Sequence, residues 1–215
     1  MSVLLYYAPG SCAFASLIAL EETGVEYEAR PVRLAEGEQK APEYLAMHPR
    51  GQVPLLKLRD GYVRENIAVL SYIANSHPTS GLLPLDEPFL LAKGYEFLSW
   101  FATNLHVSIA QLWRGKRFTD DEGVKAALKE AGLGRFVRTL AALDEWARAF
   151  DGPWILGDRF TVTDALVPVV VRWAGRLDID VARHPALEAL NHNVLARPAT
   201  QRAIEREQRG LVAPR

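Results

Sequence analysis

The sequence of 215 residues contains a single cysteine, Cys12. One cysteine cannot form a disulfide within the chain, which is typical of proteins of a reducing, cytoplasmic compartment. No apolar run approaches the roughly 18 residues of a membrane span, and the first residues lack a basic region followed by an apolar core. We therefore expect a cytoplasmic protein with neither a membrane segment nor a signal peptide.

The sequence also lacks an excess of charge. Its 25 lysines and arginines are balanced by 26 aspartates and glutamates, and the basic residues are interspersed with the acidic ones. Nucleic-acid binding needs clustered basic residues, so we expect no nucleic-acid partner. The 5 histidines and the one cysteine are too scattered for a metal-ligand spacing, so we expect no metal site.

Apolar residues are abundant instead. They make up 49% of the chain, enough for the core of one large domain or two small ones. The first apolar run, residues 1–8, predicts a buried strand. Pro9 and Gly10 break this run, Ser11 is a good cap for a helix over residues 11–23, and Gly24 ends that helix.

Cys12 falls in the first turn of this predicted helix. Unpaired backbone N–H groups at a helix start favour a nearby anion, so the position predicts a thiol more acidic than that of a free cysteine. The alternative is a small buried cysteine that only packs. The residues around Cys12 leave both interpretations open.

The rest of the first half alternates strands and helices. The expected elements are a strand at 27–32, a polar and mobile segment at 35–40 and a short helix at 42–47. Pro54 cannot donate to a ladder, so it precedes a strand at 55–58, and the turn at Asp60-Gly61 leads to a partner strand at 62–64. Asn66 is a good cap for the helix that follows.

The second half predicts helices only. Residues 77–88 have the proline- and glycine-rich composition of a linker. One face of a long helix follows, marked by Leu91, Leu98, Phe101, Leu105 and Leu112. Further helices are expected at 121–150, at 165–173, near 185–191 and near 198–206. This order predicts an α/β domain at 1–78, a linker at 79–88 and an all-α domain at 89–215.

Five segments, taken in order and spacing, carry a resemblance to a known family. They are residues 6–12, Gly51-Gln52-Val53-Pro54, Glu65-Asn66, residues 157–164 and Arg197-Pro198-Ala199. Over nearly its full length the chain resembles the glutathione transferases, and it is most similar to the bacterial beta class, whose cysteine occupies the position of Cys12. The resemblance implies a thioredoxin-like α/β N-terminal domain, an all-α helical C-terminal domain and a two-fold homodimer.

The resemblance also implies an enzyme that conjugates the thiolate of its co-substrate, glutathione, to small hydrophobic electrophiles. Two alternatives remain open: reduction of disulfides or peroxides through Cys12, and a non-catalytic binding module that keeps the fold. In conjugation Cys12 holds or activates the glutathione thiolate, whereas in reduction it becomes a mixed disulfide.

Site residues follow from the same resemblance. The implied catalytic residues are Cys12, Ser11 and His106. The implied glutathione-binding residues are Tyr6, Gln52, Val53, Pro54, Glu65 and Asn66. The implied pocket for the second substrate contains Phe101, Ala110 and Trp113.

Each of these roles has a physical basis and a simpler alternative. A cis Val53-Pro54 bond exposes backbone groups that pair with the cysteinyl part of glutathione, or it is only a rigid turn. Glu65 and Asn66 suit the γ-glutamyl group, or Asn66 is only a cap. His106 lines the site, or it only packs.

The chain departs from its relatives at three places. Ala13 and Val107 stand where those proteins often carry serine and lysine, and segment 35–40 lacks their early lysine. The glycyl carboxylate of glutathione therefore needs another cation, for which Lys40 and Arg50 are the candidates.

Overall fold

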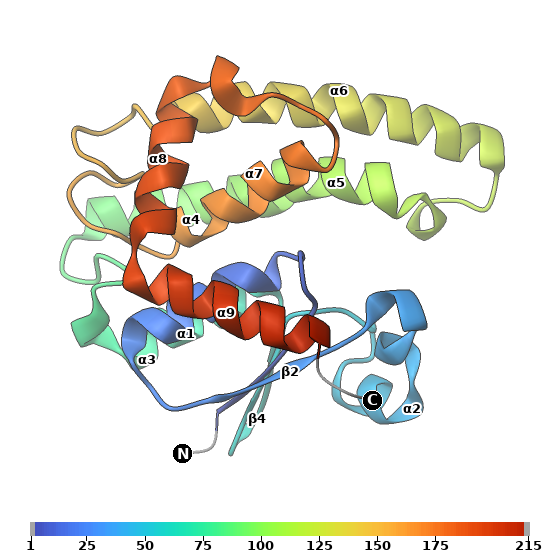
Figure 1. The fold of residues 1–215 in the computed structure, drawn as a ribbon, viewed down its shortest axis with the longest axis horizontal. Helices are drawn as coiled ribbons and strands as arrows, with labels where there is room; N and C mark the ends of the chain where they lie inside the picture. Colours follow the sequence, from blue (N-terminus) through green and yellow to red (C-terminus); the bar gives the residue numbers. More distant parts are fainter. Residues whose placement is uncertain (1–2, 213–215) are drawn as a thin grey trace.

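A computed structural model describes residues 3–212 (Figure 1). The N-terminal half contains a four-stranded sheet in the order β2-β1-β3-β4. Its strands are β1 (Leu4–Tyr7), β2 (Glu28–Pro31), β3 (Leu55–Leu58) and β4 (Gly61–Arg64). β1 pairs parallel with β2 and antiparallel with β3, and β3 and β4 form the predicted hairpin. Residues 1 and 2 of the first predicted strand lie outside the described residues.

Both faces of the sheet are covered by helices. Helices α1 (Ala13–Thr23) and α3 (Asn66–Ser76) pack against each other on one face, where Leu5, Tyr7 and Leu56 point into the main core. The short α2 (Pro42–Met47) covers the other face, where Tyr6 and Leu55 pack in a second cluster. Successive side chains of a strand point to opposite faces, which explains why neighbouring residues of β1 enter different clusters.

The second half is helical throughout. Its helices are α4 (Pro88–Trp100), α5 (His106–Trp113), α6 (Glu122–Trp146), α7 (Val167–Gly175), α8 (Pro185–Ala196) and α9 (Pro198–Val212). Figure 1 shows α4 to α7 stacked over the N-terminal half, while α8 leads back to α9, which lies along α1. No helix among residues 3–212 has the length and apolar character needed to cross a membrane.

The predicted long helix is continuous but not uniform. Residues Phe101–Leu105 form a π-helical turn that joins α4 to α5. Of the predicted apolar face, Leu98, Phe101, Leu105 and Leu112 are buried, and Leu91 is partly buried against the same core. A π turn holds one residue more than an α turn, and such turns are frequent at functional sites. Here it immediately precedes His106, the first residue of α5.

Segment 35–40 is more ordered than the sequence predicts. It forms two short 3-10 turns, Leu34–Glu36 and Glu38–Lys40. Glu38 accepts a hydrogen bond from the backbone N–H of Arg33 at 2.7 Å and pairs with its guanidinium at 2.8 Å. A polar composition does not prevent order when the side chains bond to the local backbone.

One buried cluster runs through both halves of the chain. It contains Leu5 and Phe14 from the sheet half together with Phe97, Val170 and Ala203 from the helical half. The two halves therefore share one hydrophobic core. The division of the chain into domains at 1–78 and 89–215, with a linker at 79–88, stays a prediction.

Candidate active site

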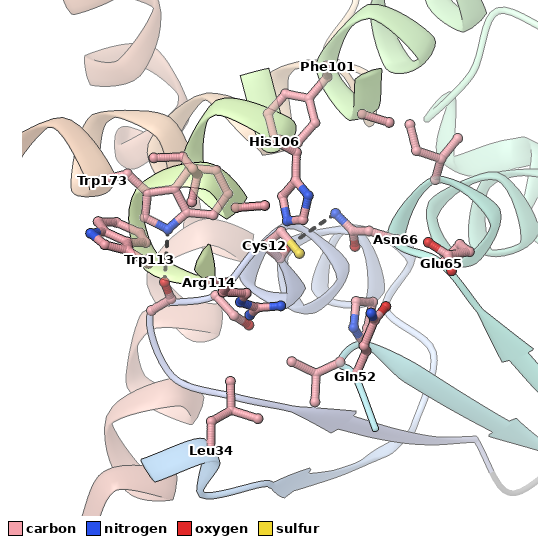
Figure 2. A pocket seen from close by; sticks show the side chains of 18 of the residues that line it. Cys12, Leu34, Gln52, Glu65, Asn66, Phe101, His106, Trp113, Arg114 and Trp173 are labelled. Carbon is pink, nitrogen blue, oxygen red and sulfur yellow. Dashed lines mark hydrogen bonds between the residues drawn. The ribbon is translucent and has the colours of Figure 1, made fainter. Parts of the chain in front are cut away.

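A cavity of about 200 Å³ lies between the two halves, beside the start of α1 (Figure 2). One side of it is formed by residues 9–12, Leu34, His48, residues 52–54 and residues 65–67. The other side is formed by Phe101, Ala102, His106, residues 109–110, residues 113–114, Trp173 and Arg176. The cavity therefore combines polar groups from the sheet half with an aromatic wall from the helical half.

Cys12 lies on the cavity but is almost fully buried, with 7% of its surface exposed. It occupies the position before the first residue of α1, one place earlier than predicted. Ser11 precedes it and accepts a hydrogen bond from the N–H of Ala13 at 3.2 Å, while its own hydroxyl donates to the carbonyl oxygen of Ala8 at 2.7 Å. Ser11 thus supports the start of the helix, and its proton is already engaged.

Burial raises the pKa of the Cys12 thiol to about 11. This value includes the opposing effect of the Arg114 charge and a smaller contribution from Glu65 that also raises the pKa. The prediction of a thiol more acidic than a free one is therefore wrong. The loss of hydration disfavours the thiolate more than the helix start favours it.

The loop before Cys12 is held by the helical half of the chain. Gly10 has a φ of 73°, a conformation that glycine adopts without strain. Its N–H donates to a carboxylate oxygen of Glu207 at 2.9 Å, and its carbonyl oxygen accepts from the indole N–H of Trp173 at 3.1 Å. Glu207 also pairs with Arg172 at 2.7 Å. Side chains of α7 and α9 thus position the cysteine loop.

Replacing Glu207 by alanine should lower the free energy of unfolding by about 1.5–3 kcal/mol, as expected for lost hydrogen bonds to a charged group. The side chain is buried, so water does not replace the bonds to Gly10 and Arg172. Urea unfolding measures the effect. Glu205→Ala is the matched control on the same helix, because Glu205 is exposed and its loss should change stability by no more than about 0.5 kcal/mol. Equal stability of the two variants would contradict the prediction.

The Val53-Pro54 peptide bond is cis, as the sequence predicts. Val53 lies on the cavity, and neither its N–H nor its carbonyl oxygen bonds to another residue in the range 3–212. The side-chain amide of the preceding Gln52 lies 3.2 Å from both terminal nitrogens of Arg117, so its oxygen accepts when it faces the guanidinium. The turn offers one free backbone donor and one free acceptor to a ligand.

Glu65 and Asn66 differ from the prediction in their local roles. Glu65, not Asn66, occupies the cap position of α3, and its φ of 69° is uncommon for a residue other than glycine. Asn66 does not cap: its amide donates to the carbonyl oxygen of Cys12 at 3.2 Å and accepts from Ser16 at 2.9 Å. Asn66 thereby ties α3 to α1, and the strained backbone at Glu65 is typical of ligand-binding positions.

His106 faces the cavity near Cys12 (Figure 2). Its ring lies 5.8 Å from the ring of Trp173, measured between centroids. Burial, together with the positive charges of Arg114 and Arg117, lowers the pKa of His106 to about 4. The imidazole is neutral at pH 7, so it can donate or accept a hydrogen bond but carries no charge.

A comparison with protein-family models and a comparison with known proteins both point to one family. Residues 1–75 match the family model described as glutathione S-transferase, N-terminal domain, and residues 100–198 match glutathione S-transferase, C-terminal domain. The chain is 32% identical to glutathione S-transferase GstA of Escherichia coli O157:H7 over 205 residues, which are 94% of this chain and 98% of that protein. The chain belongs to the glutathione S-transferase family.

Solved structures of glutathione S-transferases are similar over nearly the whole chain. A glutathione transferase homologue from Sulfitobacter, with bound glutathione, has a TM-score of 0.89 at 28% identity and covers 95% of this chain and 97% of its own. A bacterial beta class enzyme from Sphingomonas chungbukensis has a TM-score of 0.82 at 29% identity, with 95% and 98% covered. The predicted resemblance and the predicted fold class are confirmed.

The cavity gathers most of the residues expected for a glutathione S-transferase site. These are Ser11, Cys12, Gln52, Val53, Pro54, Glu65, Asn66, Phe101, His106, Ala110 and Trp113. Tyr6 is not among them: it points to the opposite face of the sheet, where its ring packs edge-on against Tyr44 at 5.8 Å. Neither candidate cation for the glycyl carboxylate lines the cavity, and Arg50 pairs with Glu65 at 2.7 Å.

Sequence reasoning missed several lining residues, among them the polar or aromatic His48, Arg114, Trp173 and Arg176. Trp173 lies in a helix that is apolar on nearly all sides, so the sequence of that helix predicts a buried core helix and not a site residue. His48 is 1% exposed, and its Nδ1 has no partner within the described part of the chain. No pattern along the sequence marks these positions, because they come from three distant parts of the chain: the end of α2, the end of α5 and the end of α7. Within residues 3–212, no group of three histidine, cysteine, aspartate or glutamate side chains is placed to hold a metal.

Proposed function

We propose that this family member binds glutathione in the cavity and conjugates its thiolate to a small electrophile. The observation that carries the proposal is the placement of Cys12 and the unpaired backbone of Val53 on the same cavity. The N–H and carbonyl of Val53 suit the cysteinyl backbone of glutathione, as in the addition of one strand to another. This pairing brings the glutathione sulfur to Cys12.

The γ-glutamyl end of glutathione is assigned to Glu65 and Asn66. The carboxylate of Glu65 suits the γ-glutamyl ammonium, and a hydrogen bond between two charged groups is stronger than one between neutral groups. The γ-glutamyl carboxylate suits the start of α3, where backbone N–H groups are unpaired. Asn66 holds this helix start beside Cys12.

Cys12 acts in this proposal as a neutral thiol. With a pKa of about 11, only about one thiol in ten thousand is ionised at pH 7. Such a group donates a hydrogen bond to the glutathione thiolate better than it attacks a disulfide. The main rate gain in conjugation then comes from holding thiolate and electrophile together. The wall formed by Phe101, Trp113 and Trp173 provides the apolar pocket for the electrophile.

Reduction of disulfides through Cys12 is the second candidate, favoured by the position of the only cysteine on the cavity. The two candidates are separated by assaying the protein with a chlorodinitrobenzene and, in parallel, with a mixed disulfide, both in the presence of glutathione. Faster turnover of the chlorodinitrobenzene supports conjugation, and faster turnover of the disulfide supports reduction. No turnover of either substrate, with glutathione bound, would favour a non-catalytic module.

A two-fold homodimer is also part of the proposal. Four exposed aromatic side chains lie on β4, α3 and α4, namely Tyr62, Tyr72, Phe89 and Tyr95. Phe89 is 71% exposed, and exposed aromatic side chains are typical of association surfaces. The surface spans both halves of the chain, which agrees with the family's pairing of one subunit's N-terminal domain with the other's helical domain.

Sedimentation at micromolar concentration should therefore give the mass of a dimer. Phe89→Asp should shift the protein toward a monomer, because the new charge would have to be buried in the interface. Phe118→Asp is the control, since Phe118 is also exposed but follows α5, outside the proposed surface. A wild-type monomer, or a dimer unaffected by Phe89→Asp, would contradict the assignment.

A further inference from the structure

Glutathione carries a carboxylate at each end, and only one of the two has been assigned. The γ-glutamyl end lies at Glu65 and Asn66 in the proposed function, and the backbone pairing with Val53 sets the direction of the tripeptide. Figure 2 shows Glu65 and Asn66 on one side of Cys12 and Arg114 on the other, with Gln52 and Leu34 nearby. The glycyl carboxylate therefore extends toward Arg114.

Arg114 is the cation best placed to bind the glycyl carboxylate. It follows the last residue of α5, its side chain is half-buried, and it lines the cavity. Its guanidinium makes no hydrogen bond, ion pair or ring contact with any residue between 3 and 212. Arg176, the other arginine on the cavity, donates to the carbonyl oxygen of Gly10 at 3.4 Å.

The surroundings of Arg114 have an unbalanced positive charge. Arg117 follows in the next turn and contacts the neutral amide of Gln52 rather than a carboxylate. Burial and the charge of Arg114 lower the pKa of Arg117, and the carboxylate of Glu65 offsets this only in part. The one carboxylate on the cavity, Glu65, is already paired with Arg50. An anionic group bound at Arg114 would remove this imbalance.

We propose that Arg114 binds the glycyl carboxylate of glutathione. This assignment rests on the proposed function and adds a consequence to it: glutathione contacts the sheet half through Val53 and Glu65 and the helical half through Arg114. A guanidinium binds a carboxylate through two parallel hydrogen bonds, which gives it geometric selectivity. Arg114 then selects glutathione over analogues that lack the glycyl charge.

The test compares glutathione with its glycyl amide, which keeps the shape and loses the negative charge. By calorimetry, the wild type should bind the amide about 10- to 100-fold more weakly than glutathione, the range for a lost charged hydrogen bond. Arg114→Ala should bind both equally, at the weaker affinity. Arg114→Lys should restore part of the preference, and Lys40→Ala, which removes an exposed cation outside the cavity, should keep it in full.

The outcomes separate this inference from the proposed function. If glutathione binds the wild type and Arg114→Ala still prefers it over the amide, the assignment of Arg114 is wrong and the proposed function stands. The assignment is equally wrong if Arg114→Ala keeps that preference and loses only activity toward a chloronitrobenzoate, since the arginine would then serve the electrophile. If the wild type does not bind glutathione, both the proposed function and the assignment are overturned.

Discussion

Glu65→Ala should bind glutathione roughly 10- to 100-fold more weakly than the wild type, which corresponds to roughly 1.5–3 kcal/mol. The variant removes the carboxylate that we assign to the γ-glutamyl ammonium. It also leaves the guanidinium of Arg50, now 2.7 Å from Glu65, beside that ammonium without a counter-charge. Both changes weaken the binding of glutathione.

Calorimetry with Glu65→Gln separates charge from shape, because glutamine keeps the length and an acceptor oxygen. Glu65→Gln should weaken the binding of glutathione nearly as much as Glu65→Ala does. Glu43→Ala is the control, since it removes an exposed carboxylate on α2 that does not line the cavity. Unchanged glutathione affinity in Glu65→Ala would exclude Glu65 from the binding site.

Cys12→Ala should retain much of the conjugation rate and lose all formation of a mixed disulfide with oxidised glutathione. The first part follows because proximity, rather than the cysteine, supplies most of the acceleration. The second part follows because the chain has no other cysteine. Steady-state conjugation and intact-mass analysis measure the two effects. Loss of conjugation in Cys12→Ala, with glutathione still bound, would show that the thiol is essential to catalysis.

The reactivity of Cys12 should also depend strongly on pH. A pKa of about 11 predicts that alkylation of the native protein is slow at pH 7 and accelerates by about tenfold per pH unit, because the thiolate is the reacting form. A free thiol, with a pKa of about 8.5, levels off at a lower pH. Intact mass after timed alkylation reports this single site. Fast alkylation at pH 7 would mean that the helix start and Arg114 outweigh burial.

Local elements of the fold were predictable because local residues determine them. Residues 42–47 form a helix with the predicted bounds, since Pro42 suits the first helical turn. Gly24 ends α1 with a φ of 69°, as a glycine at that position should. The hairpin at Gly61 followed from turn chemistry alone.

Predictions from local patterns were wrong where a side chain bonds to or packs against a residue outside its own element. Asparagine is a residue type that often caps helices, yet the side-chain amide of Asn66 forms hydrogen bonds with Cys12 and Ser16 at the start of α1. Segment 35–40 is polar, yet Glu38 folds it against the backbone of Arg33. Tyr6 belongs to the motif that carries the family resemblance, yet strand alternation turns it away from the cavity.

By itself, the sequence determined the order of strands and helices, the family and most residues on the sheet side of the cavity. These depend on turn residues, periodicity and motifs, which act over a few positions. Only the tertiary structure decided that Cys12 is buried and weakly acidic, that Glu207 and Trp173 hold its loop, and that Arg114 reaches the cavity. Burial, charge and hydrogen bonding at a site are sums over residues far apart in the chain, and those sums exist only once the chain has folded.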